Sequence, residues 1–105
     1  QQQLAYPWIT TKTLNGTISD RAKEAAEIVQ NMGMELASLD VVDGVIEATD
    51  TTFWFGFKDD VVIRIRPIEV SKVLVDVRSI SRVGQSDLGV NARRITEILA
   101  GFKNK

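Results

Sequence analysis

Two stretches of the chain repeat apolar residues at the spacing of an α-helix, and they predict one helix near each end. In GTISDRAKEAAEIVQNMG, residues 16–33, positions separated by four and three form one apolar stripe: Ile18, Ala22, Ala25, Val29 and Met32. In SDLGVNARRITEILAGF, residues 86–102, the same spacing relates Leu88, Ala92, Ile95, Leu99 and Phe102.

Capping residues support both helices. We expect Thr17 or Ser19 to cap the first helix and Gly33 to end it. Ser86 or Asp87 is the expected cap of the second helix.

Between the helices the apolar residues alternate with polar ones, as they do in β-strands. MELASL (34–39) and GVIEAT (44–49) flank Asp43-Gly44, a strong signal for a tight turn. In VVIRIR (61–66), Val61, Ile63 and Ile65 fall on one face, and Val62, Arg64 and Arg66 fall on the other. In KVLVDVRSIS (72–81), Val73, Val75 and Val77 share a face, with Leu74, Asp76 and Arg78 opposite. LAYPWITTKTL (4–14) is a further β-prone stretch, in which Pro7 favours an edge or a strand start.

The predicted order is strand, helix, four strands, helix. Short turns make neighbouring strands antiparallel, so both helices are expected to pack on the one apolar face of a sheet of four to five strands. The fold class is therefore α+β, with the element order of a helix-grip domain. The chain of 105 residues is enough for one domain, residues 1–105.

Composition removes several kinds of chemistry. The chain has no cysteine and no histidine, which excludes thiolate nucleophiles, imidazole bases and the usual zinc ligands. We expect no catalytic residue, no metal and no cofactor. The net charge of −1 argues against nucleic acid as the partner.

The start of the chain has no initiator methionine. QQQLAYPW has no signal-peptide pattern, and no apolar run reaches the ~18 residues of a membrane span. We interpret the chain as a domain or mature segment cut from a longer protein, in which upstream sequence provides a membrane anchor if there is one. The composition does not indicate a compartment.

Two segments carry a resemblance to a known family. WFGFKDDVVIRIRP (54–67) and VDVRSISRVGQSDLGVNARRI (75–95) resemble the domain-of-unknown-function family 1499 of bacteria and plastid-bearing plants. The resemblance runs from about Tyr6-Pro7 to the last helix. It implies a fold and a set of residues to inspect, and it implies no established activity. The element order is also similar, as a pattern only, to the helix-grip domains of an accessory lipoprotein of the outer-membrane barrel-assembly machinery.

An aromatic run precedes the first arginine-bearing strand. Phe53, Phe55 and Phe57 alternate and are expected in the core, while Trp54 points to the other face beside Gly56. We favour packing as the role of this run. The alternative is that Trp54 is a platform for a ligand or partner.

Asp59 and Asp60 form the only adjacent pair of carboxylates in the sequence. We predict that Lys58, Asp59 and Asp60 form the turn of a hairpin, with the aspartates bonded to backbone amides. The alternatives are a hard-cation site or an acid–base pair, both weakened because adjacent strand residues point apart.

The segment from Arg78 to Arg94 is the most unusual part of the sequence. A helix N-terminus with arginines nearby can hold a phosphate or carboxylate, but Asp87 at the cap would repel an anion. We favour a structural role in which Arg78 or Arg82 pairs with Asp59, Asp60 or Asp87. The candidate binding residues are Trp54, Asp59, Asp60, Arg78, Arg82, Asp87 and Asn91.

Two functions follow from these observations. The first is a non-enzymatic binding or interaction module with a protein partner. The alternative is a small-molecule binding protein or enzyme, whose pocket lies between the sheet and the last helix with Arg78, Arg82, Asp87 and Asn91 at its mouth. The exposed sheet face with Arg64, Arg66, Lys72, Asp76 and Arg78 is a further partner surface to consider.

Overall fold

A computed structural model describes residues 8–51, 58–81 and 88–103 of the chain. Its elements follow the order expected from the sequence: β1 (Trp8–Asn15), α1 (Ile18–Asn31), β2 (Glu35–Asp40), β3 (Val45–Thr51), β4 (Lys58–Glu69), β5 (Lys72–Ser81) and α2 (Leu88–Gly101). Every pair of neighbouring strands is antiparallel, and the order across the sheet is β1-β5-β4-β3-β2. The prediction of an α+β fold with one antiparallel sheet is confirmed.

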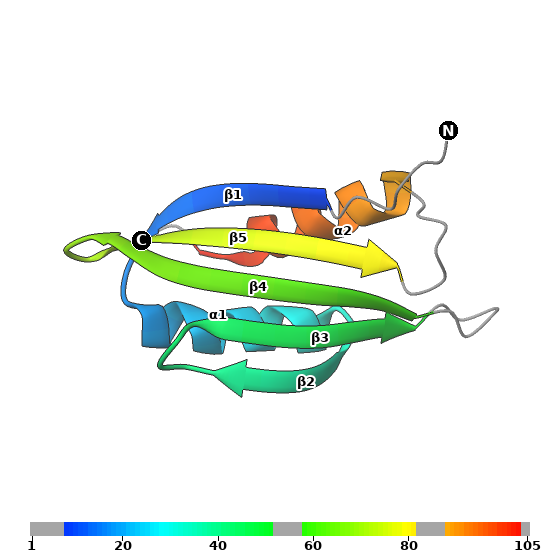
Figure 1. The fold of residues 1–105 in the computed structure, drawn as a ribbon, viewed down its shortest axis with the longest axis horizontal. Coiled ribbons are helices and arrows are strands. Elements are labelled where there is room, and N and C mark those ends of the chain that lie inside the picture. The colour runs from blue at the N-terminus through cyan, green and yellow to red at the C-terminus, as the bar shows by residue number, and fades with distance from the viewer. Residues whose placement is uncertain (1–7, 52–57, 82–87, 104–105) are drawn as a thin grey trace.

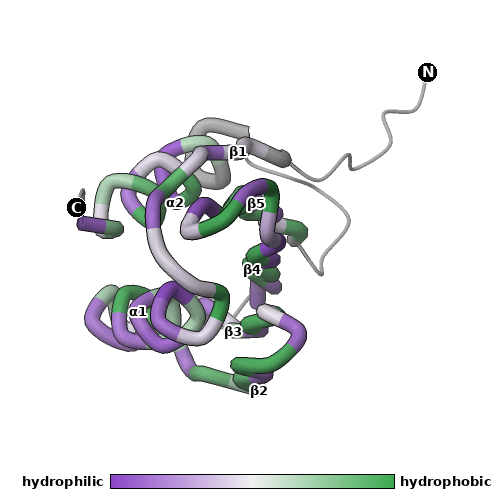
Figure 2. Tube along the Cα trace, turned by 90° about the vertical axis from the view of Figure 1, so that its left-hand side faces the viewer, coloured by the Kyte–Doolittle hydropathy of each residue, from purple (hydrophilic) through white to green (hydrophobic). Residues whose placement is uncertain are grey.

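Both helices lie on the same side of the sheet. Figure 1 shows the five strands in front, with α1 behind the β3 and β2 side and α2 behind the β1 and β5 side. The view turned by 90° in Figure 2 separates the two layers, with α1 and α2 on one side and the strands on the other. The opposite face of the sheet, here called the outer face, carries no described helix.

The core fills the space between the layers. The apolar faces of the central strands supply Val61, Ile63 and Ile65 from β4 and Val73, Val75 and Val77 from β5, all at most 1% exposed. The helices complete the core with the following side chains: Ala22, Ala25 and Val29 of α1, and Ile95, Ile98 and Leu99 of α2, with Phe102 just after it. Of the predicted stripes, Ala22, Ala25 and Val29 in the first and Ile95, Leu99 and Phe102 in the second therefore lie in the core between the helices and the sheet.

The ends of α1 agree with their sequence signals. The Thr17 hydroxyl accepts a hydrogen bond from the Asp20 amide at 3.1 Å, so Thr17 is the cap. Gly33 follows the helix with a φ of 91°, a conformation that glycine adopts without a steric penalty. Ser86 and Asp87, the expected caps of α2, lie outside the described residues.

The expected turn at Lys58, Asp59 and Asp60 is wrong, because these three residues begin β4. They pair with Thr51, Asp50 and Thr49 of β3. Strand geometry then separates the two aspartates: Asp59 shares the helix-covered face with Val61, and Asp60 shares the outer face with Val62. Pairing on both sides holds this acidic stretch in a strand despite its turn-like composition.

The connection between β4 and β5 is shorter than the sequence indicated. The predicted strands 61–66 and 72–81 left PIEVS, residues 67–71, as the link between them, but β4 continues through Pro67 to Glu69 and leaves only Val70 and Ser71 as the turn. β3 stops pairing at Arg64, so Pro67 lies where β4 has β5 as its one described neighbour. The Ile65 amide donates to Gly44 on the β3 side, and alternation turns the Pro67 nitrogen the same way, so no ladder bond is lost there.

Candidate functional site

The outer faces of β4 and β5 carry a concentration of basic side chains, which we call the basic stripe. Strand alternation places five basic residues on this face: Lys58, Arg64, Arg66, Lys72 and Arg78. Three acidic residues, Asp60, Asp76 and Glu69, lie on the same face. The whole chain has a net charge of −1, so the stripe is positive on a slightly negative molecule. Acidic residues of the neighbouring strands, Glu35 and Glu47, lie towards the other side of the outer face.

Asp76 lies inside the basic stripe, as the alternation in the sequence suggested. It pairs across the strands with Arg64, and its Oδ2 atom accepts from Arg66 Nη2 at 3.1 Å. The Asp76 side chain is 12% exposed, whereas that of Arg66 is 61% exposed. Asp76 therefore neutralises one arginine and leaves most of that guanidinium accessible.

Two arginines of the stripe have no ion pair within the described part of the chain, namely Arg64 and Arg78. Arg64 is exposed and Arg78 is half-buried. The half-buried Val62, which pairs with Arg78, and the half-buried Leu74 provide aliphatic surface between the charged groups. Charged donors around an aliphatic centre can contact a protein surface by hydrogen bonds and by burial together.

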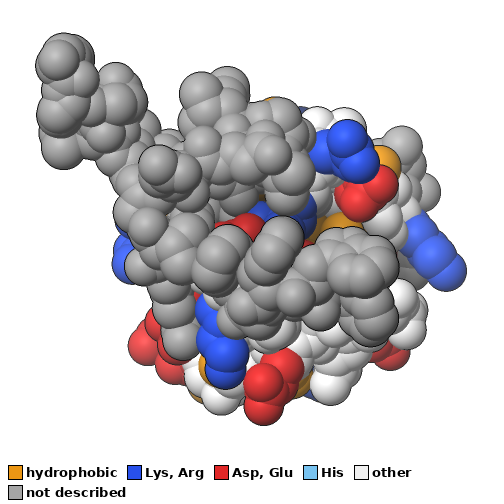
Figure 3. All heavy atoms as spheres, turned by 90° about the vertical axis from the view of Figure 1, so that its right-hand side faces the viewer, with side chains coloured by type: hydrophobic (Ala, Val, Ile, Leu, Met, Phe, Trp, Pro, Cys, Tyr) orange, Lys and Arg blue, Asp and Glu red, His pale blue; other side chains and the backbone are white. Residues whose placement is uncertain are grey.

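A second charged cluster lies on the helix-covered face, where β3 ends and β4 begins. Asp50 and Asp59 are directly opposite each other across the strands, and Arg94 of α2 lies between them. Arg94 Nη2 is 3.0 Å from an oxygen of each carboxylate, and Arg94 Nη1 donates to the Ser79 hydroxyl at 2.9 Å. Figure 3 looks at this end of the sheet, where acidic and basic side chains lie close together.

This cluster of Arg94, Asp50 and Asp59 has a structural role. The Arg94 and Asp59 side chains are only 7% and 12% exposed. Two carboxylates opposite each other on a strand pair repel, and the guanidinium between them offsets that repulsion. The bonds tie α2 to β3, β4 and β5 at once, so Arg94 fixes the helix on the sheet.

The structure places the predicted site residues in different parts of the fold. Asp59 meets an arginine as expected, but the partner is Arg94 and not Arg78. Arg78 and Asp60 are on the outer face, away from Asp59. Asn91 belongs to α2. Trp54, Arg82 and Asp87 lie outside the described residues, as do Phe53, Phe55 and Phe57.

A groove of about 630 Å³ runs along α1, where the sequence predicted no site. Its lining includes Arg21, Glu24 and Glu27 of α1, with Gly101 and Lys103 from the end of the chain. It is therefore distinct from the expected pocket between the sheet and α2, which was to have Arg78 and Asn91 at its mouth.

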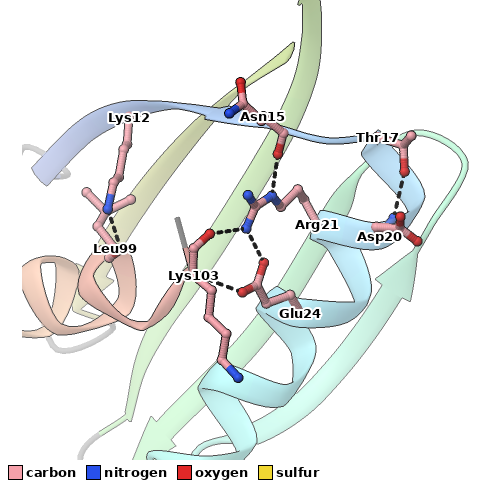
Figure 4. Close-up of polar contacts among 8 residues, drawn as sticks. All are labelled: Lys12, Asn15, Thr17, Asp20, Arg21, Glu24, Leu99 and Lys103. Atoms are coloured by element: carbon pink, nitrogen blue, oxygen red, sulfur yellow. Dashed lines mark hydrogen bonds and ion pairs between the residues drawn. The ribbon is translucent and has the colours of Figure 1, made fainter. Parts of the chain in front are cut away.

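Arg21 lines this groove and binds three partners (Figure 4). Its Nε donates to the Asn15 carbonyl at 2.7 Å, and its Nη1 donates to Glu24 and to the Lys103 carbonyl at 2.6 and 2.9 Å. The Lys103 amide donates in turn to the other Glu24 oxygen at 2.8 Å. Arg21 and Glu24 thus join the end of β1, the start of α1 and the segment after α2.

Arg21 and Arg94 were not among the predicted site residues, although the sequence contains a signal for Arg94. It precedes Ile98 by four positions and therefore falls on the face of α2 that packs on the sheet. A charge in an apolar stripe requires a buried counter-charge, and the aspartates of the neighbouring strands were the available ones.

The comparison with protein families decides what the chain is related to. Residues 1–102 match the model of a family described as "Protein of unknown function (DUF1499)". The chain belongs to the DUF1499 family. The match confirms the resemblance noted in the 54–67 and 75–95 segments. A search of curated proteins found no match to this DUF1499 domain.

Two further observations describe the DUF1499 domain. Neither α1 nor α2 has the length and apolar character that a membrane crossing requires. Within residues 8–51, 58–81 and 88–103, no three Asp or Glu side chains are grouped so that they could hold a metal ion.

Proposed function

We propose that this DUF1499 domain is a non-enzymatic interaction module that binds an acidic protein surface through the basic stripe. The observation that supports the proposal is the concentration of Lys58, Arg64, Arg66, Lys72 and Arg78 on a sheet face without a described helix over it. Complementary charge steers two proteins together and fixes their orientation.

The composition of the stripe fits a protein partner. Arginine is enriched in protein interfaces, where its planar guanidinium binds a carboxylate with two parallel hydrogen bonds. Arg64 and Arg66 lie on β4, whose backbone is already paired with β5, so their backbone positions need no ordering when a partner binds. Binding is expected to weaken as salt rises, since the charges are exposed.

The Arg94 cluster supports a binding role in preference to catalysis. A carboxylate pair is a candidate acid–base site only if one member can reach a substrate proton. Here both Asp50 and Asp59 accept from Arg94, and Asp59 is buried against the core. Their contacts serve the packing of α2.

A titration with poly-L-glutamate tests the proposal by NMR. We expect the amide signals of β4 and β5 to shift, and the shifts to shrink when Arg64→Glu and Arg78→Glu are combined. The control combines Lys23→Glu and Arg93→Glu, two exposed positions on the helices that give the same change in net charge. Equal loss in both double variants, or shifts on α1 only, would contradict the basic stripe as the binding surface.

The groove along α1 supports the alternative, a small-molecule binding protein. Its volume of about 630 Å³ is within the range of ligand pockets, which are roughly 300–1,000 Å³. Fragment screening by NMR separates the two functions. Ligands that shift Glu24, Glu27 and Ile28 and leave β4 and β5 unchanged would favour the alternative.

A further inference from the structure

The two edges of the sheet are not equally protected against pairing with another strand. β2 has a bulge between Leu36 and Ser38, and the charged Glu35 and Asp40 stand at its ends. A second β2 approaching in antiparallel order would bring Glu35 close to the other copy's Asp40. Bulges and charges of this kind discourage pairing at an edge.

β1 has none of these features. It pairs with β5 in one unbroken register from Trp8 to Asn15 and contains no proline. Its single charged side chain is Lys12, and the Lys12 ammonium is turned to the helix layer, where it donates to the Leu99 carbonyl at 3.1 Å (Figure 4). Thr10, Thr11 and Thr13 are exposed.

The backbone alternation identifies the groups at the β1 edge. The Gly16 amide donates to Ser71 across the β1–β5 pair, so even-numbered residues of β1 point their amides and carbonyls to β5. The backbone amides and carbonyls of Ile9, Thr11 and Thr13 therefore point away from β5, to the free edge of the sheet. Within the described part of the chain, the outward-pointing backbone groups of these three residues make no hydrogen bond beyond the sheet, whereas the Asn15 carbonyl accepts from Arg21.

We infer that β1 pairs with β1 of a second copy of this chain, antiparallel and centred on Thr11, to form one continuous sheet. This register places Thr11 opposite its own copy and Ile9 opposite Thr13, so each of these pairs exchanges two backbone bonds. On the helix side Lys12 lies opposite Thr10, so no like charges face each other. Threonine pairs across strands are favourable.

The flank of α2 beside this edge permits the close approach. Gly101 faces α1, since a side-chain carbon there would lie 3.1 Å from Ile28. Ala92 and Thr96 are roughly on the opposite side of the helix, given about 3.6 residues per turn. They are small, and the Thr96 hydroxyl is bonded to the Ala92 carbonyl at 2.9 Å. Two copies of α2 can therefore run side by side above the joined strands.

The two-fold axis of this dimer is perpendicular to the sheet, so both basic stripes are on the same outer face. The dimer does not depend on the acidic partner proposed above, because it uses the outward-pointing backbone groups of the β1 edge, whereas the stripe consists of side chains on the outer faces of β4 and β5. In this register residues 8–14 of each β1 pair, which is a small interface, and we expect a dissociation constant in the micromolar range.

Sedimentation equilibrium over a wide range of concentrations tests the dimer. The wild type is expected to be in monomer–dimer equilibrium. Thr11→Lys and Thr11→Glu, each alone, place like charges opposite each other and should raise the dissociation constant about fivefold or more. An equal mixture of the two variants should restore association, because Lys then opposes Glu.

Thr11→Val is the matched control, since valine keeps the shape and the strand preference, and it should associate as the wild type does. A wild type that stays monomeric throughout the range would overturn the inference, as would a mixture that associates no better than either variant alone. Circular dichroism of each variant confirms that it is folded, so that a lost dimer is separated from a lost fold.

Discussion

At the scale of single residues, Asp59 differs most clearly between the role that the sequence predicted and its place in the structure. Its place beside Lys58 and Asp60 has the composition of a turn, yet it is a buried strand residue facing Asp50. The difference lies in Arg94, which is 35 positions further along the chain and binds both carboxylates. Local composition does not contain that long-range contact.

Arg94→Ala is predicted to lower the free energy of unfolding by about 3 kcal/mol, because it leaves buried Asp59 without its counter-charge. Urea denaturation followed by circular dichroism measures the loss. Arg93→Ala changes the exposed neighbour and should alter stability by less than about 0.5 kcal/mol.

Asp59→Asn combined with Arg94→Ala provides a second check on the cluster. The double variant should lose less stability than the sum of the two single losses, because Asp59→Asn removes the carboxylate that Arg94→Ala alone leaves buried and unpaired. Additive losses would show that the two side chains do not interact, and the structural role of the cluster would then be wrong.

At the scale of elements, the tight turn between β2 and β3 is built around Gly44. The Asp40 carboxylate accepts from the Val42 and Asp43 amides at 3.0 and 2.9 Å, and Gly44 has a φ of 71°. The Gly44 carbonyl then accepts from Ile65, which connects the turn to β4. The Asp43-Gly44 signal in the sequence thus marks a turn that also contacts a third strand.

Gly44→Ala is predicted to cost about 3 kcal/mol or more of the free energy of unfolding. Its added carbon would clash with the Ile65 carbonyl oxygen and would lie 2.8 Å from Ile18 Cγ2. Gly33→Ala is the control, because its φ is also positive but no atom lies within 4 Å, and it should cost only about 1–2 kcal/mol. Equal losses in urea denaturation would contradict the close packing of this turn.

The elements themselves were largely readable from the sequence. The apolar stripes located both helices, and the alternation from Lys72 to Ser81 gave β5 with its observed bounds. The strand through Asp59 and Pro67 was not readable, because acidic residues and proline disfavour strands until neighbouring strands pair with them. The contact of Arg21 with the Lys103 carbonyl was not readable either, since the two residues are 82 positions apart in the chain.

At the scale of the whole molecule, the helix layer and the outer face divide the roles. The helix side holds the apolar core and the buried Arg94 cluster, which give stability. The outer face holds the basic stripe, whose Arg64 and Arg78 have no ion pair among the described residues. The alternation in the sequence already separated these two faces. The predicted pairing of Arg78 with Asp59 or Asp60 assumed that residues 58–60 form a turn, whereas in the structure they belong to β4.

A photo-crosslinking residue at Val62 tests most directly whether the basic stripe is the binding surface. The full-length protein is irradiated in its native cells, and adducts are identified by mass spectrometry. We predict a discrete adduct from Val62 that is lost when Arg64→Glu and Arg78→Glu are added, and no such adduct from the same residue placed at Lys23 on α1. The same adducts from both positions, or an adduct that survives the charge reversal, would contradict the assignment of the stripe as an interaction surface.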